Sequence, residues 1–422
     1  MYEIIKNKIV IIFSKFKDLE TSSCGIFVKA GSRYEDKNIK GASHFIEHLL
    51  FKGSKKYSNK EIKREIEGRG GLLNAFTSYE FLGYYAHFLS KNIKITLDIL
   101  LDMVFNPLFK KEDIEKERTV ILEELKMYYD LPASRSLMLL NKLLWQNHPL
   151  GEEIIGDFDT IEKIKREDLL NFKNTFYHPK NIIISLTGSL DIKDIVKFID
   201  KRIDTKKTID KKIITKPPKP LYGINIELEN KKISQIHLSI GFRGLSYLSK
   251  DRFTIELLNI ILGANTSSRL FENIREEKAL CYDISTDIKK FKDTGAFIIH
   301  LGLDKKNLKV ALENILKELV RIKKTVSEKE LTRAKDYFIG QITMGLETPQ
   351  GRMFYLSENY ITQEKIYTLN DIKDKINPIN TKDISSLANK IFSFKNMCVS
   401  CVGDIEKNAK DEMEDLIKKF IK

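Results

Sequence analysis

The sequence predicts an α+β fold, and two kinds of observation support this fold class. Residues 24–30 and 233–241 have the apolar composition of β-strands, and such segments are mixed with long segments of helical periodicity. The two halves of the chain also resemble each other. These features indicate α+β domains rather than a doubly wound parallel sheet.

The likeness between the halves is clearest near their ends. In the first half, an apolar run at residues 182–186 leads into Gly188 and a helical tail. In the second half, a run at residues 397–402 leads into Gly403 and another such tail. We therefore interpret the chain as a duplicated domain.

The long helices of the two halves keep nearly the same offset, because Pro132 follows the first and Pro349 follows the second. Residues 205–220 are rich in lysine and proline, which favours extended backbone. We expect the following organisation: a first domain at residues 1–204, a linker at residues 205–220 and a second domain at residues 221–422.

The most informative motif of the first half is His44-Phe45-Ile46-Glu47-His48. In a helix, His44 and His48 stack four residues apart with Glu47 beside them, and the opposite face is apolar. Two neutral imidazoles and a carboxylate can bind a metal ion and take a proton from water. A histidine on a helix is more often an ordinary core or surface residue, so the motif alone leaves both interpretations open.

A third ligand is predicted on a helix at residues 109–129. Glu117 and Glu124 lie two turns apart and share one face. Glu124 lies at the margin of the apolar side, where an ionised carboxylate is costly unless it is paired. Glu123 falls on the polar side and is the expected solvated residue.

The motif, with its glutamate directly before the second histidine and with Glu124 downstream, resembles the inverted-motif zinc peptidases of the pitrilysin or insulinase family. That family includes insulin-degrading enzyme and mitochondrial processing peptidase, and this chain is similar to the short bacterial members. Further likeness lies in residues 70–77, in residues 148–151 followed by Gly156, and in residues 268–271. Arg275 and Tyr282 follow at the family's spacing.

The resemblance implies two homologous domains, each with a mostly antiparallel sheet flanked by helices. It implies one zinc ion held by His44, His48 and Glu124, with Glu47 as general base. Glu117, which shares a face with Glu124, is expected to orient a ligand histidine. We expect no metal site in the second domain, which lacks these residues.

The resemblance further implies that Arg275 and Tyr282 bind the peptide and stabilise the oxyanion. Asn74 and Ala75 are expected to receive the substrate as an added strand, although a packed strand is the alternative interpretation. Because the chain holds one metal half and one half with the Arg275–Tyr282 pair, the resemblance implies a dimer of identical or different chains. Each site would then be completed by the second domain of the other subunit.

Composition excludes several other classes of protein. No apolar run approaches the roughly 18 residues needed to cross a bilayer, and residues 9–13 are too short for a signal-peptide core. We therefore expect a cytoplasmic protein that does not bind a membrane. Cys398 and Cys401 lie on opposite faces of a predicted strand, and we expect them to be core residues.

The formal net charge of +13 raises the rival hypothesis of a nucleic-acid-binding protein. The excess is mostly lysine dispersed among acidic residues, with no arginine and aromatic platform, so we expect peptide substrates and no nucleic-acid partner. A second rival is a non-catalytic or partner-dependent subunit of a heterodimeric processing peptidase with the same fold. Two imidazoles and one carboxylate also suit manganese, cobalt or iron, so the residues alone leave the metal open.

Overall fold

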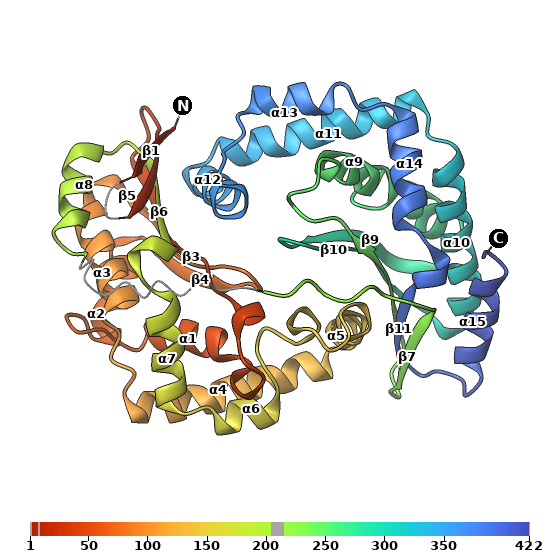
Figure 1. The fold of residues 1–422 in the computed structure, drawn as a ribbon, viewed down its shortest axis with the longest axis horizontal. Coiled ribbons are helices and arrows are strands. Elements are labelled where there is room, and N and C mark those ends of the chain that lie inside the picture. Colours follow the sequence, from red (N-terminus) through yellow and green to blue (C-terminus); the bar gives the residue numbers. More distant parts are fainter. Residues whose placement is uncertain (1, 7–8, 204–214, 422) are drawn as a thin grey trace. The chain divides into compact units, whose positions relative to one another are not determined.

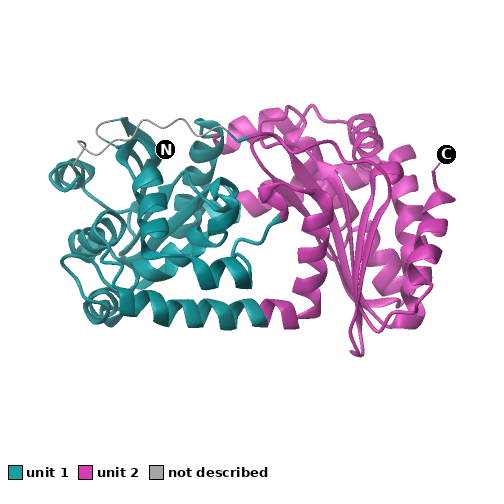
Figure 2. Ribbon diagram, turned by 60° about the horizontal axis from the view of Figure 1, so that its bottom comes forward, with its two compact units in different colours: residues 1–126, 152–215, 343–366 teal, residues 127–151, 216–342, 367–422 magenta. Residues whose placement is uncertain are grey.

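The computed structural model describes residues 2–6, 9–203 and 215–421. Within the predicted linker at residues 205–220, residues 205–214 lie outside the described part of the chain, and residues 215–220 form neither helix nor strand. The described residues form two compact units, which Figure 2 shows in different colours. Unit 1 comprises residues 1–126, 152–215 and 343–366, and unit 2 comprises residues 127–151, 216–342 and 367–422.

Unit 1 is built around a six-stranded sheet with the order β1-β2-β6-β3-β5-β4. Figure 1 labels five of these strands, β1, β3, β4, β5 and β6. All neighbours in this sheet are antiparallel except β2 and β6, which are parallel. The strands are β1 Glu3–Lys6, β2 Val10–Lys15, β3 Thr21–Val28, β4 Leu72–Thr77, β5 Leu82–Leu89 and β6 Ile182–Gly188. The helices are α1 Ala42–Leu50, α2 Asn59–Ile66, α3 Ile93–Phe105, most of α4 Lys111–Asp130, α6 Phe158–Lys163, α7 Arg166–Phe176, α8 Ile192–Asp200 and α12 Pro349–Gln363.

Unit 2 repeats this plan with a five-stranded sheet of order β7-β11-β8-β10-β9, in which only β7 and β11 are parallel. Its strands are β7 Asn225–Asn230, β8 Ile236–Gly244, β9 Cys281–Lys290, β10 Gly295–Leu303 and β11 Cys398–Gly403. Its helices are α5 Pro132–Leu144, α9 Arg252–Leu262, α10 Leu308–Lys324, most of α11 Glu328–Leu346, α13 Leu369–Ile376, α14 Thr381–Ile391 and α15 Ala409–Lys418. A π-helix, η7 Phe271–Glu277, precedes β9.

The two sheets correspond strand by strand, with β2-β6-β3-β5-β4 matching β7-β11-β8-β10-β9 and the parallel pair at the same place. Gly188 and Gly403 end the matching strands β6 and β11, both at positive φ (139° and 157°). The predicted fold class, two similar α+β domains with mostly antiparallel sheets, is therefore confirmed. Cys398 and Cys401 are fully buried in β11, as predicted for core residues, and burial raises the pKa of each thiol to about 12.

The compact units differ from the predicted continuous domains in two exchanged helices. Helix α12 belongs to the second half of the sequence, yet it packs on β6, β3 and β2 of unit 1. Its Met353 is fully buried in a core cluster that contains Phe27 and Ile183, and Thr187 donates a hydrogen bond to the carbonyl oxygen of Pro349 (2.6 Å). Each unit is thus completed by residues from the other half of the chain.

The reciprocal helix, α5, belongs to the first half and packs on β8, β11 and β7 of unit 2. A Cβ on Gly241 in β8 would lie 3.0 Å from Leu144 Cδ1, so this glycine allows the helix to approach the sheet closely. The next residue, Phe242, points to the other face and contacts Phe392 at the end of α14. The sheet of unit 2 is therefore covered on both faces. Among the described residues, no helix is long and apolar enough to span a membrane.

Candidate metal centre

Helix α1 carries the histidine motif and is amphipathic as predicted. Its apolar side chains, among them Phe45 and Ile46, are buried, whereas His44, Glu47 and His48 are partly exposed. The three polar side chains therefore share the outer face of the helix. This placement follows from helical spacing alone.

The start of α1 is held by a partly buried carboxylate. Glu35 accepts hydrogen bonds from the backbone N–H groups of Gly41 (2.7 Å) and Ser43 (2.6 Å). Because the first N–H groups of a helix have no partner within the helix, this carboxylate acts as their cap. Burial raises the pKa of Glu35 to about 7, although hydrogen bonds from Ser43 and Gly41 oppose the rise.

Two glycines let a loop pack against the same end of α1. Gly41 and Gly156 both have positive φ (87° and 89°). A Cβ on Gly156 would lie 2.6 Å from the carbonyl oxygen of Lys40 and 3.0 Å from Gly41 Cα, which leaves no room for a side chain. Gly156, which the sequence singled out, therefore permits contact between two backbone segments at the start of the metal-site helix.

Helix α4 brings Glu124 to the two histidines. Glu124 Oε2 lies 3.9 Å from His44 Nε2 and 3.6 Å from His48 Nε2. One ligand atom from each of the three residues lies within 4.8 Å of the others. In the part of the chain that the structure describes, this is the only group of three such residues close enough to hold a metal ion.

The spacing of these atoms fits a shared metal better than hydrogen bonds. Both N–O distances exceed hydrogen-bond range, whereas two ligands of one tetrahedral zinc ion lie about 3.3 Å apart. Burial, together with the nearby His48, lowers the pKa of His44 to about 3, so this imidazole is neutral and able to bind a metal at neutral pH. A histidine that binds a metal usually donates a hydrogen bond from its other ring nitrogen. His44 departs from this pattern, because its Nδ1 is buried without a hydrogen-bond partner among the described residues.

Glu117 supports His48 from behind. Glu117 Oε2 lies 3.1 Å from His48 Nδ1, and Oε1 forms an ion pair with Lys52 Nζ (2.5 Å). Burial alone would raise the pKa of Glu117, but the hydrogen bonds and charges of His48 and Lys52 outweigh it and lower the pKa. An ionised Glu117 accepts a hydrogen bond from Nδ1–H, which leaves the lone pair of Nε2 on the side of Glu124.

Glu47 is hydrogen-bonded to the neighbouring strand. Thr77, the last residue of β4, donates from Oγ1 to Glu47 Oε2 (2.5 Å). Burial raises the pKa of Glu47, and the bond from Thr77 opposes the rise. A carboxylate with a raised pKa is suited to accept and release protons near neutral pH.

Strand β4, which contains Asn74 and Ala75, is an edge strand of the sheet in unit 1. Within the described residues it pairs only with β5. Asn74 is exposed, and its Oδ1 accepts a hydrogen bond from the N–H of Ala75 (2.8 Å). The outer edge of β4 has the form required for the addition of an extended peptide, while the role of these two residues stays a prediction.

Arg275 and Tyr282 lie near each other within unit 2. The guanidinium carbon of Arg275 is 5.7 Å from the centre of the Tyr282 ring and 4.5 Å from that of Phe271. Tyr282 is 78% exposed, so its hydroxyl is accessible to a ligand. The two residues are therefore neighbours in space, and their role toward a peptide stays a prediction.

The helix of the second copy that corresponds to α4 carries other residues at the positions of Glu117 and Glu124. The duplication places Ala334 opposite Glu117 and Gln341 opposite Glu124, both on α11. Ala334 is as buried as Glu117, so the position is retained while its chemistry is absent.

Three residues around the site were not assigned roles from the sequence. Thr77 contacts α1 only through the tertiary fold and carries no local signal. Glu35 lies six and eight residues before the N–H groups that it binds, which is not the spacing of a standard helix cap. Lys52 lies one turn beyond His48, and this spacing could have identified it as a neighbour of the site.

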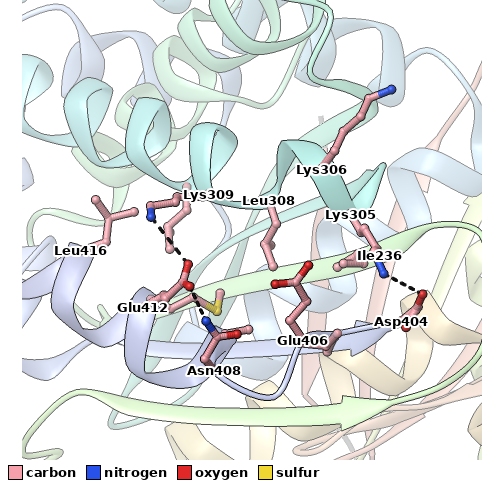
Figure 3. Close-up of a pocket in the computed structure, with 14 residues that line it drawn as sticks. Ile236, Lys305, Lys306, Leu308, Lys309, Asp404, Glu406, Asn408, Glu412 and Leu416 are labelled. Atoms are coloured by element: carbon pink, nitrogen blue, oxygen red, sulfur yellow. Dashed lines mark hydrogen bonds and ion pairs between the residues drawn. The ribbon is translucent and has the colours of Figure 1, made fainter.

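Unit 2 also contains a cavity of about 180 Å³ between α10, α15 and the end of β11 (Figure 3). Leu308 and Leu416 are among the apolar residues that line it. Charged side chains also line it and form ion pairs with one another, as Lys305 does with Asp404 (2.9 Å). None of the predicted site residues lines this cavity.

The fold and the site together define the class of this protein. It is a duplicated α+β protein in which one copy carries a cluster of side chains able to hold a metal ion. Comparisons with known proteins agree with this class. Residues 10–157 match the family described as Insulinase (Peptidase family M16), and residues 163–338 match the domain described as Peptidase M16 inactive domain. The chain belongs to peptidase family M16, which confirms the resemblance found in the sequence.

Individual relatives cover nearly the whole chain. An uncharacterized zinc protease of Bacillus subtilis (strain 168) is 31% identical over 392 residues, which is 92% of this chain and 94% of that protein. An uncharacterized zinc protease of Rickettsia bellii (strain RML369-C) is 33% identical over 394 residues, with the same coverage. The crystal structure of a protease from Helicobacter pylori has a TM-score of 0.89 at 22% identity and covers 95% of this chain and 99% of its own, which shows the fold alone.

Proposed function

We propose that this protein is a zinc-dependent endopeptidase that hydrolyses peptides or unfolded polypeptide segments. The observation that carries this proposal is the convergence of His44, His48 and Glu124 within 4.8 Å, with Glu47 on the same face of α1. The relatives named as zinc proteases support the metal and the peptidase activity.

In this proposal, one divalent ion is held by the Nε2 atoms of His44 and His48 and by a carboxylate oxygen of Glu124. Bound zinc supplies the Lewis-acid chemistry that makes water nucleophilic at neutral pH. Glu117 keeps the Nδ1 proton of His48 in place and thereby holds its ring in the orientation in which Nε2 can bind the ion.

Glu47 carries the proton during hydrolysis. Its Oε2 accepts a hydrogen bond from Thr77, which orients the carboxylate, and the carboxylate takes a proton from the attacking water. The water oxygen bonds to the peptide carbonyl carbon, the C–N bond breaks, and Glu47 passes the proton to the departing nitrogen. The carboxylate is then restored without any net change.

The substrate is proposed to bind as an extended strand along the outer edge of β4. Hydrogen bonds to the backbone at Asn74 and Ala75 would hold peptides of many sequences, because the main chain is common to all of them. Arg275 and Tyr282 are proposed to donate hydrogen bonds to the peptide and to the developing oxyanion. We propose that the protein acts as a dimer in the cytoplasm, with this pair supplied by the other subunit.

The central test is the Glu47→Gln variant in a peptide-library assay read by mass spectrometry. Glutamine retains the shape of the side chain but cannot accept the proton, so zinc content should be retained while cleavage falls by at least ~100-fold. Glu123→Gln, at an exposed position on α4, is the matched control and should cleave normally. Undiminished cleavage by the Glu47→Gln protein would contradict the mechanism.

The alternative function is a non-catalytic or partner-dependent subunit of a processing peptidase. The same assay separates it from the proposal when the unmodified protein is tested alone at micromolar concentration. Zinc binding without cleavage of any library peptide would favour the subunit. Salt-dependent nucleic-acid binding that survives metal removal would instead favour the basic-protein hypothesis.

A further inference from the structure

The motif at residues 268–271 leads directly into the seven-residue π-helix η7, and the proposed chemistry gives this motif no role. π-Helical winding is rare, is often found at functional sites, and persists only where its surroundings hold it. Leu270 and Ile274 are fully buried, whereas Arg275 is partly exposed. The π-helix is therefore the element that presents Arg275.

The middle of the π-helix is bound to a buried carboxylate on α10. Asn273 Nδ2 donates a hydrogen bond to Glu318 Oε1 (2.7 Å), and the Glu318 side chain is only 5% exposed. The second oxygen of Glu318 is buried without a partner among the described residues. Arg321, three residues further along α10, lies 3.4 Å from the same Oε1 through its Nη1 and also stabilises this carboxylate. Asn273 makes the shorter bond to the buried group, whose burial is costly, and because Asn273 belongs to η7 its bond ties η7 to α10.

The start of the segment is bound to α11 by a two-pronged ion pair. Arg269 Nε and Nη2 donate to the two carboxylate oxygens of Glu330 (2.6 and 2.9 Å), and Nη2 also donates to the carbonyl oxygen of Thr325. Burial alone would raise the pKa of Glu330, but the bonds from Arg269 and Ser327 lower it to about 2. This ion pair is therefore intact throughout the physiological pH range.

The end of the π-helix leads into the strand that carries Tyr282. The N–H of Leu280 donates to the carbonyl oxygen of Ile274 (3.0 Å), and β9 begins at Cys281. Arg275 contacts the rings of Phe271 and Tyr282 in this winding. If this segment wound as an α-helix, its hydrogen-bond register would shift by one residue. Arg275 would then be rotated by about 100° about the helix axis.

We propose that the two contacts Asn273–Glu318 and Arg269–Glu330 are clamps that hold the π-helix and thereby position Arg275 for the peptide substrate. This inference rests on the proposed function, because Arg275 matters to activity only if the protein binds peptides. Asn273, Glu318, Arg269 and Glu330 are positioning residues in this scheme. They act through Arg275 and do not touch the substrate.

The experiment compares Asn273→Ala with the control Asn314→Ala, because Asn314 is a partly exposed residue of α10 whose side chain bonds, among the described residues, within its own helix. The rate of amide hydrogen exchange in residues 268–280 reports whether the Asn273–Glu318 contact stabilises the π-helix, and this measurement requires no enzymatic activity. Loss of this contact should speed exchange there, while exchange in α11 stays unchanged. Asn314→Ala should leave both regions as in the unmodified protein.

Steady-state cleavage of a library-derived peptide measures the consequence for Arg275. The kcat/KM of Asn273→Ala should fall by roughly 10-fold or more at unchanged zinc content, because small misplacements of a binding group are costly. In the Arg275→Ala background, the same change should have no further effect on kcat/KM. If Asn273 had only a structural role, Asn273→Ala would instead lower kcat/KM by the same factor in the unmodified protein and in the Arg275→Ala background.

Each outcome decides one point. Unchanged exchange in Asn273→Ala overturns the Asn273–Glu318 clamp, and faster exchange with undiminished kcat/KM, or with additive effects, overturns the positioning of Arg275. If the unmodified protein cleaves nothing, the proposed function fails and the role in activity fails with it. The exchange measurement then still decides whether the clamp exists.

Discussion

Met353→Ala tests the exchanged helix α12, which places a residue of the second half of the sequence in the core of the unit that holds the histidines. Met353 is fully buried and packs with Phe27 and Ile183. Its sulfur also lies 3.1 Å from the position that a Cβ on Gly25 would occupy in β3. The substitution therefore removes contacts between α12 and the centre of the sheet.

The expected loss of stability follows from this burial. Truncation of a buried methionine to alanine costs about 2–5 kcal/mol, from lost transfer free energy and from the cavity left behind, and we take about 3 kcal/mol. For a unit of roughly 200 residues, each kcal/mol lowers Tm by about 2–4 °C, so a decrease of about 6–12 °C is expected.

Scanning calorimetry and urea unfolding followed by circular dichroism measure this decrease. Met344→Ala is the matched control, because Met344 is 57% exposed on α11, and its effect should stay within about 0.5 kcal/mol. If the two variants unfold at the same temperature, Met353 does not lie in the core of unit 1, and the helix exchange is wrong.

Three further predictions concern the site. Glu117→Gln should weaken zinc affinity by about 10–100-fold in a competition titration with a chelating dye, because an ionised partner of His48 is lost, while Glu123→Gln should bind as the unmodified protein does. Folding raises the pKa of Glu35 from 4.5 to about 7, so the protonated form of Glu35 stabilises the folded state at low pH. The free energy of unfolding of the unmodified protein, relative to that of Glu35→Gln, should therefore decline by up to about 3 kcal/mol as the pH rises through that range. A difference in urea unfolding that does not change with pH would contradict this. Removal of the metal with a chelator should abolish peptide cleavage, and added zinc should restore it, whereas cleavage that persists in chelator would exclude the mechanism.

The sequence could predict those parts of the site that depend on local geometry. His44, Glu47 and His48 share a face because helical periodicity relates residues three and four apart, and the same rule relates Glu117 to Glu124. The fold class could be predicted for a similar reason, since strand composition and the repeated order of segments are properties of the chain itself.

Contacts between distant segments needed the tertiary structure. Thr77 reaches Glu47 across 30 positions of sequence. This contact produces no periodic signal, because the two side chains meet only after the sheet and the helix have packed.

The sequence by itself determined the two-copy α+β plan, through composition and the repeated order of segments, and it placed metal-type side chains on two helices, which the family resemblance joined into one site. Only the tertiary structure decided that α5 and α12 complete the sheet of the opposite copy. The physical reason is that an amphipathic helix specifies an apolar face but not its partner, and the partner is chosen by which sheet offers a complementary surface when the whole chain packs.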